Sequence, residues 1–86
     1  MSEKEKIVGK VINYYSKINV AAIKVVDDCI AIGDTIRIKG ATTDLVQKVE
    51  SLEIDKKPVE IAETGASVGI KVNERVRPND TVYKVL

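Results

Sequence analysis

The chain has 86 residues, 44% of them apolar, and its 14 basic and 13 acidic side chains give a formal net charge of +1. Such a length buries roughly 60–70% of the unfolded chain's surface, which is enough for one small core. The balanced charge argues against a partner bound by bulk positive charge, and the lack of histidine excludes His-based triads and His metal ligands.

The apolar residues are mostly β-branched. Thirteen Val and eleven Ile stand against three Leu, with no Phe and no Trp. Such side chains suit a pleated sheet and are slightly disfavoured in helices, so the composition indicates an all-β fold. No stretch approaches the roughly 18 apolar residues of a membrane span. Residues 1–5 are expected to be a disordered leader, and residues 6–86 one domain.

The first strands are expected to form a hairpin. Residues 6–15 and 20–28 are rich in β-formers, and the turn residues at 16–19 separate them. The single cysteine, Cys29, follows directly and can form no internal disulfide, which is typical of a cytoplasmic protein. Because Asp27 and Asp28 precede it, we do not expect an activated thiol there.

Three further stretches alternate between apolar and polar residues. Residues 32–40 do so most cleanly, and residues 66–74 and 80–86 predict two more strands. A turn is expected around Gly65. Gly69 lies between two apolar positions, which suggests that a neighbouring backbone approaches it closely.

Residues 42–57 are ambiguous. Leu45, Val49 and Leu52 have the spacing of one helix face, whereas a strand would need a bulge to keep the apolar residues inward. Periodicity alone favours the helix. Pro58 is expected to break the chain after this segment.

The pattern Asp-Thr-(Ile/Val) occurs twice. Gly33 and Asn79, which tolerate positive φ, precede Asp34 and Asp80, whose carboxylates can accept local backbone N–H groups. The alternative is a catalytic carboxylate pair, as in a glycosidase or a two-metal site. No further ligand cluster or aromatic sugar platform accompanies the two residues, so the sequence favours turns that precede strands.

The order of these pieces resembles the second domain of translation elongation factors of the elongation factor Tu class. That family has a hydrophobic-x-x-Gly-Asp-x-(Ile/Val) turn, a Val-x-Ser strand, an Ala-x-x-Gly-x-x-Val-Gly segment and a final Gly-Asp turn. The matching segments here are 30–36, 49–52, 62–70 and 79–82, and the resemblance covers residues 6–86. It implies a closed six-stranded antiparallel-type β-barrel, with 44–54 as a strand.

The resemblance also implies a function. It predicts a non-catalytic, translation-associated module that binds ribosomal RNA, transfer RNA or a translation GTPase. The chain lacks a Gly-x-x-x-x-Gly-Lys-(Ser/Thr) phosphate loop, so we expect no bound nucleotide, no cofactor, no metal and no enzyme activity. Glu50 matches a Glu of the aminoacyl-end pocket, whereas Glu53 replaces a basic residue there.

Aromatic faces beside a cation can stack on bases, and outward basic side chains can bind phosphates; the alternative is an ordinary solvated surface. The candidate RNA contacts are Tyr14, Tyr15, Lys17, Arg37, Lys39, Glu50, Lys71, Arg75 and Arg77. The residues expected to shape turns are Gly33, Asp34, Gly65, Gly69, Asn79 and Asp80.

The alternative function is a protein-interaction adaptor that acts in trans with a separate GTPase or enzyme. Related barrels also occur as accessory domains, including the C-terminal region of some collagenase-type peptidases. The nearly neutral net charge suits this alternative. In either case the chain is expected in the cytoplasm without a membrane partner.

Overall fold

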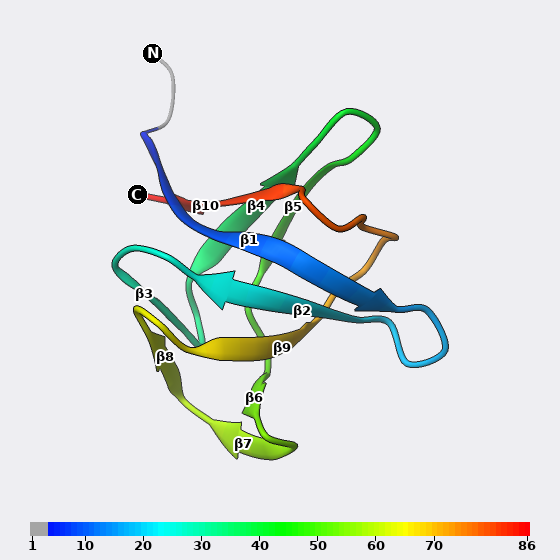
Figure 1. The fold of residues 1–86 in the computed structure, drawn as a ribbon. Coiled ribbons are helices and arrows are strands. Elements are labelled where there is room, and N and C mark those ends of the chain that lie inside the picture. Colours follow the sequence, from blue (N-terminus) through cyan, green and yellow to red (C-terminus); the bar gives the residue numbers. More distant parts are fainter. Residues whose placement is uncertain (1–3) are drawn as a thin grey trace.

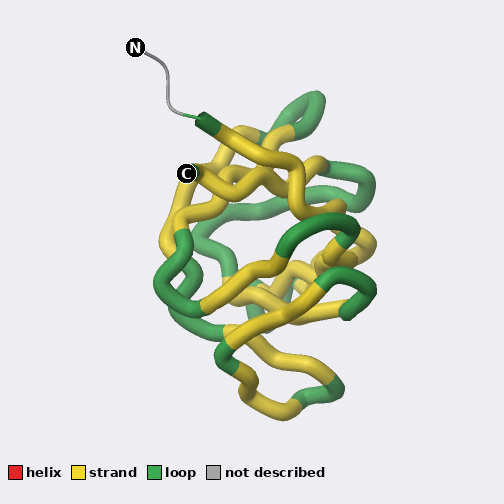
Figure 2. Tube along the Cα trace, turned by 90° about the vertical axis from the view of Figure 1, so that its left-hand side faces the viewer, coloured by secondary structure: helices red, strands yellow, loops and turns green. Residues whose placement is uncertain are grey.

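The computed structural model describes residues 4–86, and Figures 1 and 2 show that they consist of strands and loops. No helix in this range is long and apolar enough to cross a membrane. The all-β prediction is confirmed. The strands are β1 (Glu5–Tyr15), β2 (Val20–Val25), β3 (Cys29–Ala31), β4 (Thr35–Lys39), β5 (Asp44–Lys48), β6 (Leu52–Ile54), β7 (Lys57–Val59), β8 (Ile61–Glu63), β9 (Ser67–Lys71) and β10 (Thr81–Val85).

The strands pair antiparallel, as expected of the barrel, but the pairing within residues 4–86 does not confirm a closed six-stranded ring. Eight strands form one sheet in the order β5-β4-β10-β1-β2-β9-β6-β7, and β3 pairs with β8. However, β5 and β6 are successive pieces of one segment: β5 pairs with β4, and β6 pairs with β9. Residues 49–51 therefore join the two sides of the sheet along the chain, without a continuous hydrogen-bonded ladder.

The segment 44–54 is extended, as the family resemblance implied and the helical periodicity did not. Leu45, Gln47 and Val49 are buried at every second position, and the next buried residue is Leu52, three positions further on. The pattern thus changes phase between β5 and β6, in the way a bulge would. The helix-like spacing arose from this change of phase.

Glu5 and Pro58 differ from expectation. Residues 1–3 lie outside the described part, but Glu5 already pairs with Val85, so β1 begins inside the segment expected to be a leader. Pro58 does not break the chain: it lies in β7, opposite Glu53. Because β7 is the last strand in the order of its sheet, its proline removes no bond from a central ladder.

The core is aliphatic and contains no aromatic side chain. Alternate residues of β2, β4 and β9 point inward, as the period-2 patterns predicted. The buried hydrophobic residues are Val8, Val11, Ala21, Ile23, Val25, Ile30, Ile36, Ile38, Leu45, Val49, Leu52, Ala62, Val68, Ile70, Val72, Val76 and Val82.

The two Asp-Thr stretches form the same turn. The Asp34 carboxylate accepts the N–H of Ala31 at 2.9 Å, and the Asp34 N–H donates to the Ala31 carbonyl at 3.1 Å. The Asp80 carboxylate and N–H bond Arg77 at the same two distances, 2.9 and 3.1 Å. The preceding residues have φ of 97° at Gly33 and 77° at Asn79. Each Asp thus fixes a turn directly before a strand.

These two aspartates do not form a carboxylate pair. In the antiparallel ladder of β4 and β10, Thr35 lies opposite Val85, and Lys39 lies opposite Thr81. The turns therefore precede opposite ends of the strand pair, and at about 3.4 Å per residue their carboxylates are more than about 10 Å apart. Nor does any group of three or more His, Cys, Asp or Glu in residues 4–86 form a possible metal site.

Candidate binding groove

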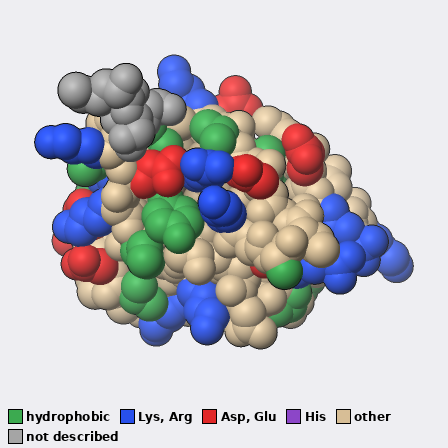
Figure 3. Space-filling model, turned by 90° about the horizontal axis from the view of Figure 1, so that it is seen from above, with side chains coloured by type: hydrophobic (Ala, Val, Ile, Leu, Met, Phe, Trp, Pro, Cys, Tyr) green, Lys and Arg blue, Asp and Glu red, His purple; other side chains and the backbone are tan. Residues whose placement is uncertain are grey.

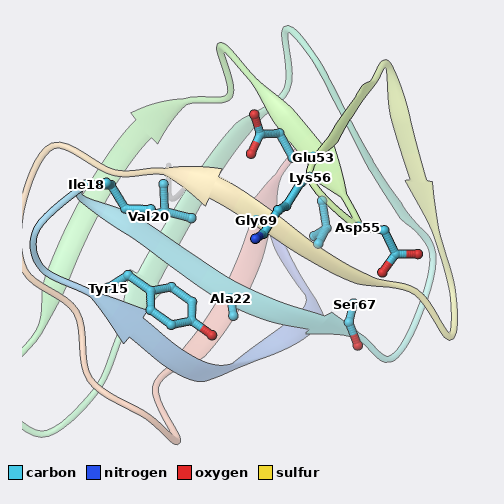
Figure 4. A pocket seen from close by; sticks show the side chains of 10 residues that line it. Tyr15, Ile18, Val20, Ala22, Glu53, Asp55, Lys56, Ser67 and Gly69 are labelled. Carbon is cyan, nitrogen blue, oxygen red and sulfur yellow. The ribbon is translucent and has the colours of Figure 1, made fainter.

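A groove lies on the outer face of the sheet, over β2, β9 and β6 (Figure 4). We call it the outer groove; its volume is about 450 Å³. Its floor is low because two small residues lie side by side: Ala22 of β2 pairs with Gly69 of β9. On the other side of Gly69 lies its partner in β6, Glu53. A Cβ at Gly69 would approach Val20 Cγ1 to 3.2 Å. The residues lining the groove are Tyr15, Ile18, Val20, Ala22, Glu53, Asp55, Lys56, Ser67, Val68 and Gly69.

The two hairpins beside the floor form walls of different chemistry. The β1–β2 hairpin contributes an apolar wall of Tyr15, Ile18 and Val20, in which Tyr15 is 49% and Ile18 61% exposed. The β6–β7 hairpin contributes a charged wall, with Asp55 and Lys56 in its turn at φ of 52° and 65°. Two successive positive φ values are typical of a tight two-residue hairpin turn. Figure 4 shows Tyr15 and Ile18 on the side away from Asp55.

The first candidate RNA contacts lie together at the tip of the β1–β2 hairpin. Tyr14, Tyr15 and Lys17 line a second hollow with Ser16 and Ile18, and Tyr15 and Ile18 belong to both hollows. The Tyr14 hydroxyl bonds Asn19 Oδ1 at 3.3 Å. The sequence thus located an aromatic surface, but most of the outer groove lies beyond it.

Most of the remaining basic candidates lie at the same end of the molecule. Lys71 pairs with Val20, and the N–H of the next residue, Val72, bonds the Asn19 carbonyl at 2.8 Å. Arg75 and Arg77 follow in the exposed loop before β10, and Lys39 ends the neighbouring β4. Figure 3 shows Lys and Arg side chains gathered at the end to which the β1–β2 hairpin projects in Figure 1. Glu50 is exposed between β5 and β6.

Unlike the other basic candidates, Arg37 is held by acidic side chains within residues 4–86. Its Nε and Nη2 each donate to the Asp44 carboxylate at 2.9 Å, and Nη1 donates to Glu5 Oε2 at 3.1 Å. The hydrogen bonds to Asp44 and Glu5 raise the pKa of the Arg37 guanidinium. The bond from Arg37 likewise lowers the pKa of the Asp44 carboxyl. This side chain links β4, β5 and β1 at the surface.

Replacing this guanidinium should make stability depend less on pH. A carboxyl whose folded pKa is lowered stabilises the fold above its unfolded pKa, and this is lost as pH falls through the folded value. Arg37→Gln should therefore lower the urea midpoint at neutral pH, with the gap to the parent chain closing as pH falls through the lowered pKa of Asp44. Urea unfolding followed by circular dichroism measures this. Lys71→Gln, which removes a charge with no ion pair within residues 4–86, should leave the pH profile unchanged; a gap that is constant with pH would contradict the prediction.

A second charged cluster surrounds Lys84. The Lys84 ammonium lies 3.3 Å from Asp34 Oδ2, 4.0 Å from Asp28 Oδ1 and 3.8 Å from Cys29 Sγ. Burial lowers the pKa of Lys84, but the hydrogen bond to Asp34 and the nearby charges outweigh it, so the pKa is raised. The Lys84 charge in turn lowers the pKa of Asp28. The cluster fixes the turn at Asp34 against β10.

Sequence reasoning missed most of the groove. Gly69 was expected at a close approach, but nothing in the sequence showed that Ala22 and Glu53 would lie next to it. Asp55 and Lys56 had no expected role at all. The one usable signal was a small residue on the outward face of each of two strands.

Two solved structures share the fold of this chain. The fold matches the C-terminal domain of a Geobacillus thermoleovorans protein named as a U32 peptidase, with a TM-score of 0.85, 18% identity, and coverage of 92% of this chain and 91% of that one. It also matches part of GDP-bound aIF5B from Aeropyrum pernix, with a TM-score of 0.63, 17% identity, and coverage of 95% of this chain and 14% of that one. Both likenesses concern the fold.

Two curated relatives are similar in sequence. The chain is 48% identical over 77 residues to an uncharacterized protease of Methanocaldococcus jannaschii, covering 88% of this chain and 19% of the relative. It is 41% identical over 78 residues to a collagenase of Porphyromonas gingivalis, covering 90% of this chain and 22% of the collagenase. The chain thus spans about a fifth of the length of these relatives. No protein-family model matches it.

These relatives correct the functional predictions. The prediction of a translation-associated, RNA-binding module is wrong, and the expectation of no enzyme activity is contradicted as well, because the relatives are named as a protease and collagenases. The resemblance to elongation factors extends only to the shared β fold. Whether the basic candidate residues contact a partner of any kind stays an untested prediction.

Proposed function

We propose that the chain serves as a β domain of a U32-type peptidase and binds the polypeptide on which that peptidase acts. The observation that carries this proposal is the 48% and 41% identity to a protease and a collagenase over nearly the whole chain. The fold likeness to the C-terminal domain of a protein named as a U32 peptidase supports it.

The outer groove supports the binding role. Its volume of about 450 Å³ falls in the range of ligand sites, and it combines apolar side chains with a few charged groups. Exposed Tyr15 and Ile18 are the kind of side chains that anchor protein contacts. A cytoplasmic location is part of the proposal, and the free thiol of Cys29 supports it.

A domain exchange tests the function. The matching 78 residues of the Porphyromonas gingivalis collagenase are deleted, or replaced by this chain, and hydrolysis of gelatin and of a short peptide is measured. We expect the deletion to raise KM for gelatin about tenfold, which corresponds to about 1.4 kcal/mol, and to have little effect on KM for the short peptide. The exchange should restore the original KM for gelatin. A folded chimera with the KM of the deletion, or a deletion without effect, would contradict the proposal.

A further inference from the structure

We propose that the outer groove takes an extended polypeptide segment in which apolar and basic side chains alternate. This inference rests on the proposed function and specifies the class of polypeptide. It follows from the shape of the floor, from the two unlike walls, and from the charges that the fold leaves without partners.

The floor suits an extended chain. It crosses three neighbouring strands, β2, β9 and β6, and so spans about 10 Å at about 4.8 Å per strand. Along this width Ala22 and Gly69 present almost no side chain, and Ser67 is the next outward residue of β9. Over β2 and β9 a polypeptide backbone can therefore lie on the floor without first displacing large side chains, with Glu53 of β6 beside it.

The charged wall favours a basic ligand. Within residues 4–86, neither the Glu53 nor the Asp55 carboxylate takes part in a hydrogen bond or an ion pair, although both line the groove. Lys56 also lines it, so the wall carries two negative charges and one positive charge. Complementary charge gives specificity at such surfaces, and the net charge here selects a Lys or Arg side chain.

The apolar wall favours a different side chain at the neighbouring position. This wall offers apolar surface from Tyr15, Ile18 and Val20. The Tyr15 side chain is about half exposed. In an extended chain successive side chains point to opposite sides. A segment lying between the two hairpins therefore directs one side chain to the β1–β2 hairpin and the next to the β6–β7 hairpin, which selects alternation.

Three fluorescent peptides of equal length test this. One alternates Leu and Lys, one alternates Leu and Glu, and one alternates Ser and Lys; binding to the 86-residue chain is followed by fluorescence anisotropy. We expect the Leu-Lys peptide to bind at least about tenfold more tightly than either of the others, because each control loses the contacts of one wall.

Charge variants localise the site. Glu53→Lys should weaken binding of the Leu-Lys peptide about tenfold, and Lys56→Glu should strengthen it. Glu63→Lys makes the same change of charge as Glu53→Lys, but on β8, outside the groove, and should have little effect. Gly69→Val fills the floor and should abolish binding. Circular dichroism of each variant establishes that it is folded.

Several outcomes would overturn the inference. Tighter binding of the Leu-Glu or Ser-Lys peptide would do so, as would equal losses in Glu53→Lys and Glu63→Lys. Concentration-dependent dimerisation that Ile18→Ser abolishes would assign the groove to a second copy of the chain. If the domain exchange restores gelatin hydrolysis while the peptides show no preference, only this inference fails; if the exchange also fails, the proposed function fails with it.

Discussion

Gly40→Ala is expected to lower the free energy of unfolding by about 2–4 kcal/mol. A Cβ at this position would overlap the Asp80 carboxylate, which is only 5% exposed and accepts the Arg77 N–H. The carboxylate can move away only by giving up that hydrogen bond, which is partly buried, and the Arg77 N–H would then lose its partner in the turn. Urea unfolding followed by circular dichroism measures the loss.

A double variant separates this overlap from other effects of losing glycine. In an Asp80→Ala background the methyl group has room, so Gly40→Ala should cost much less there than in the parent chain. Gly33→Ala is the matched control: nothing lies within 4 Å of its Cβ, and its φ of 97° alone should cost about 1–2 kcal/mol. Strict additivity of Gly40→Ala and Asp80→Ala would contradict the explanation.

Gln47→Leu is expected to cost about 2–4 kcal/mol. The Gln47 side chain is 9% exposed; its Nε2 donates to the Lys71 carbonyl at 2.9 Å, and its Oε1 accepts the Asn73 N–H at 2.8 Å. The amide thus joins the edge of β5 to the chain that leaves β9, two segments of residues 4–86 that no strand pairing connects. Leucine fills the space but leaves both backbone groups without partners. Urea unfolding and hydrogen exchange at the Asn73 amide measure the effect.

Gln47→Glu tests the donor separately. Its carboxylate still accepts the Asn73 N–H, but it can donate to the Lys71 carbonyl only when protonated. The pKa of the new carboxyl should therefore be raised in the folded state, so the variant should recover stability relative to the parent chain as pH falls through that value. A deficit that does not change between neutral and acidic pH would show that the donated bond is unimportant.

The segment 42–57 shows why sequence periodicity was insufficient. The helical spacing of Leu45, Val49 and Leu52 is also the spacing of two short strands with a change of phase between them. Only the pairing of β5 with β4 and of β6 with β9 distinguishes the two possibilities. The family resemblance gave the right answer because it carried information about those distant partners.

The same resemblance gave the wrong function. A shared β fold connects this domain with both aIF5B and a protein named as a U32 peptidase, and one fold supports unrelated activities. The finding that favours the peptidase connection over the translation factor is the sequence identity to a protease (48%) and to a collagenase (41%). Basic and aromatic residues at the hairpin tip do not by themselves distinguish RNA from a protein partner.

The sequence by itself determined the features that depend on neighbouring residues. The β-branched composition and the period-2 patterns specified strands and their inward faces, and residues such as Gly33 and Asp34 specified turns, because φ preference and local hydrogen bonds act over a few positions. The tertiary structure alone decided how the sheet is joined and where the groove lies. Ala22 and Gly69 form the floor, with Glu53 beside it, only because three strands, distant in sequence, pair in one particular register.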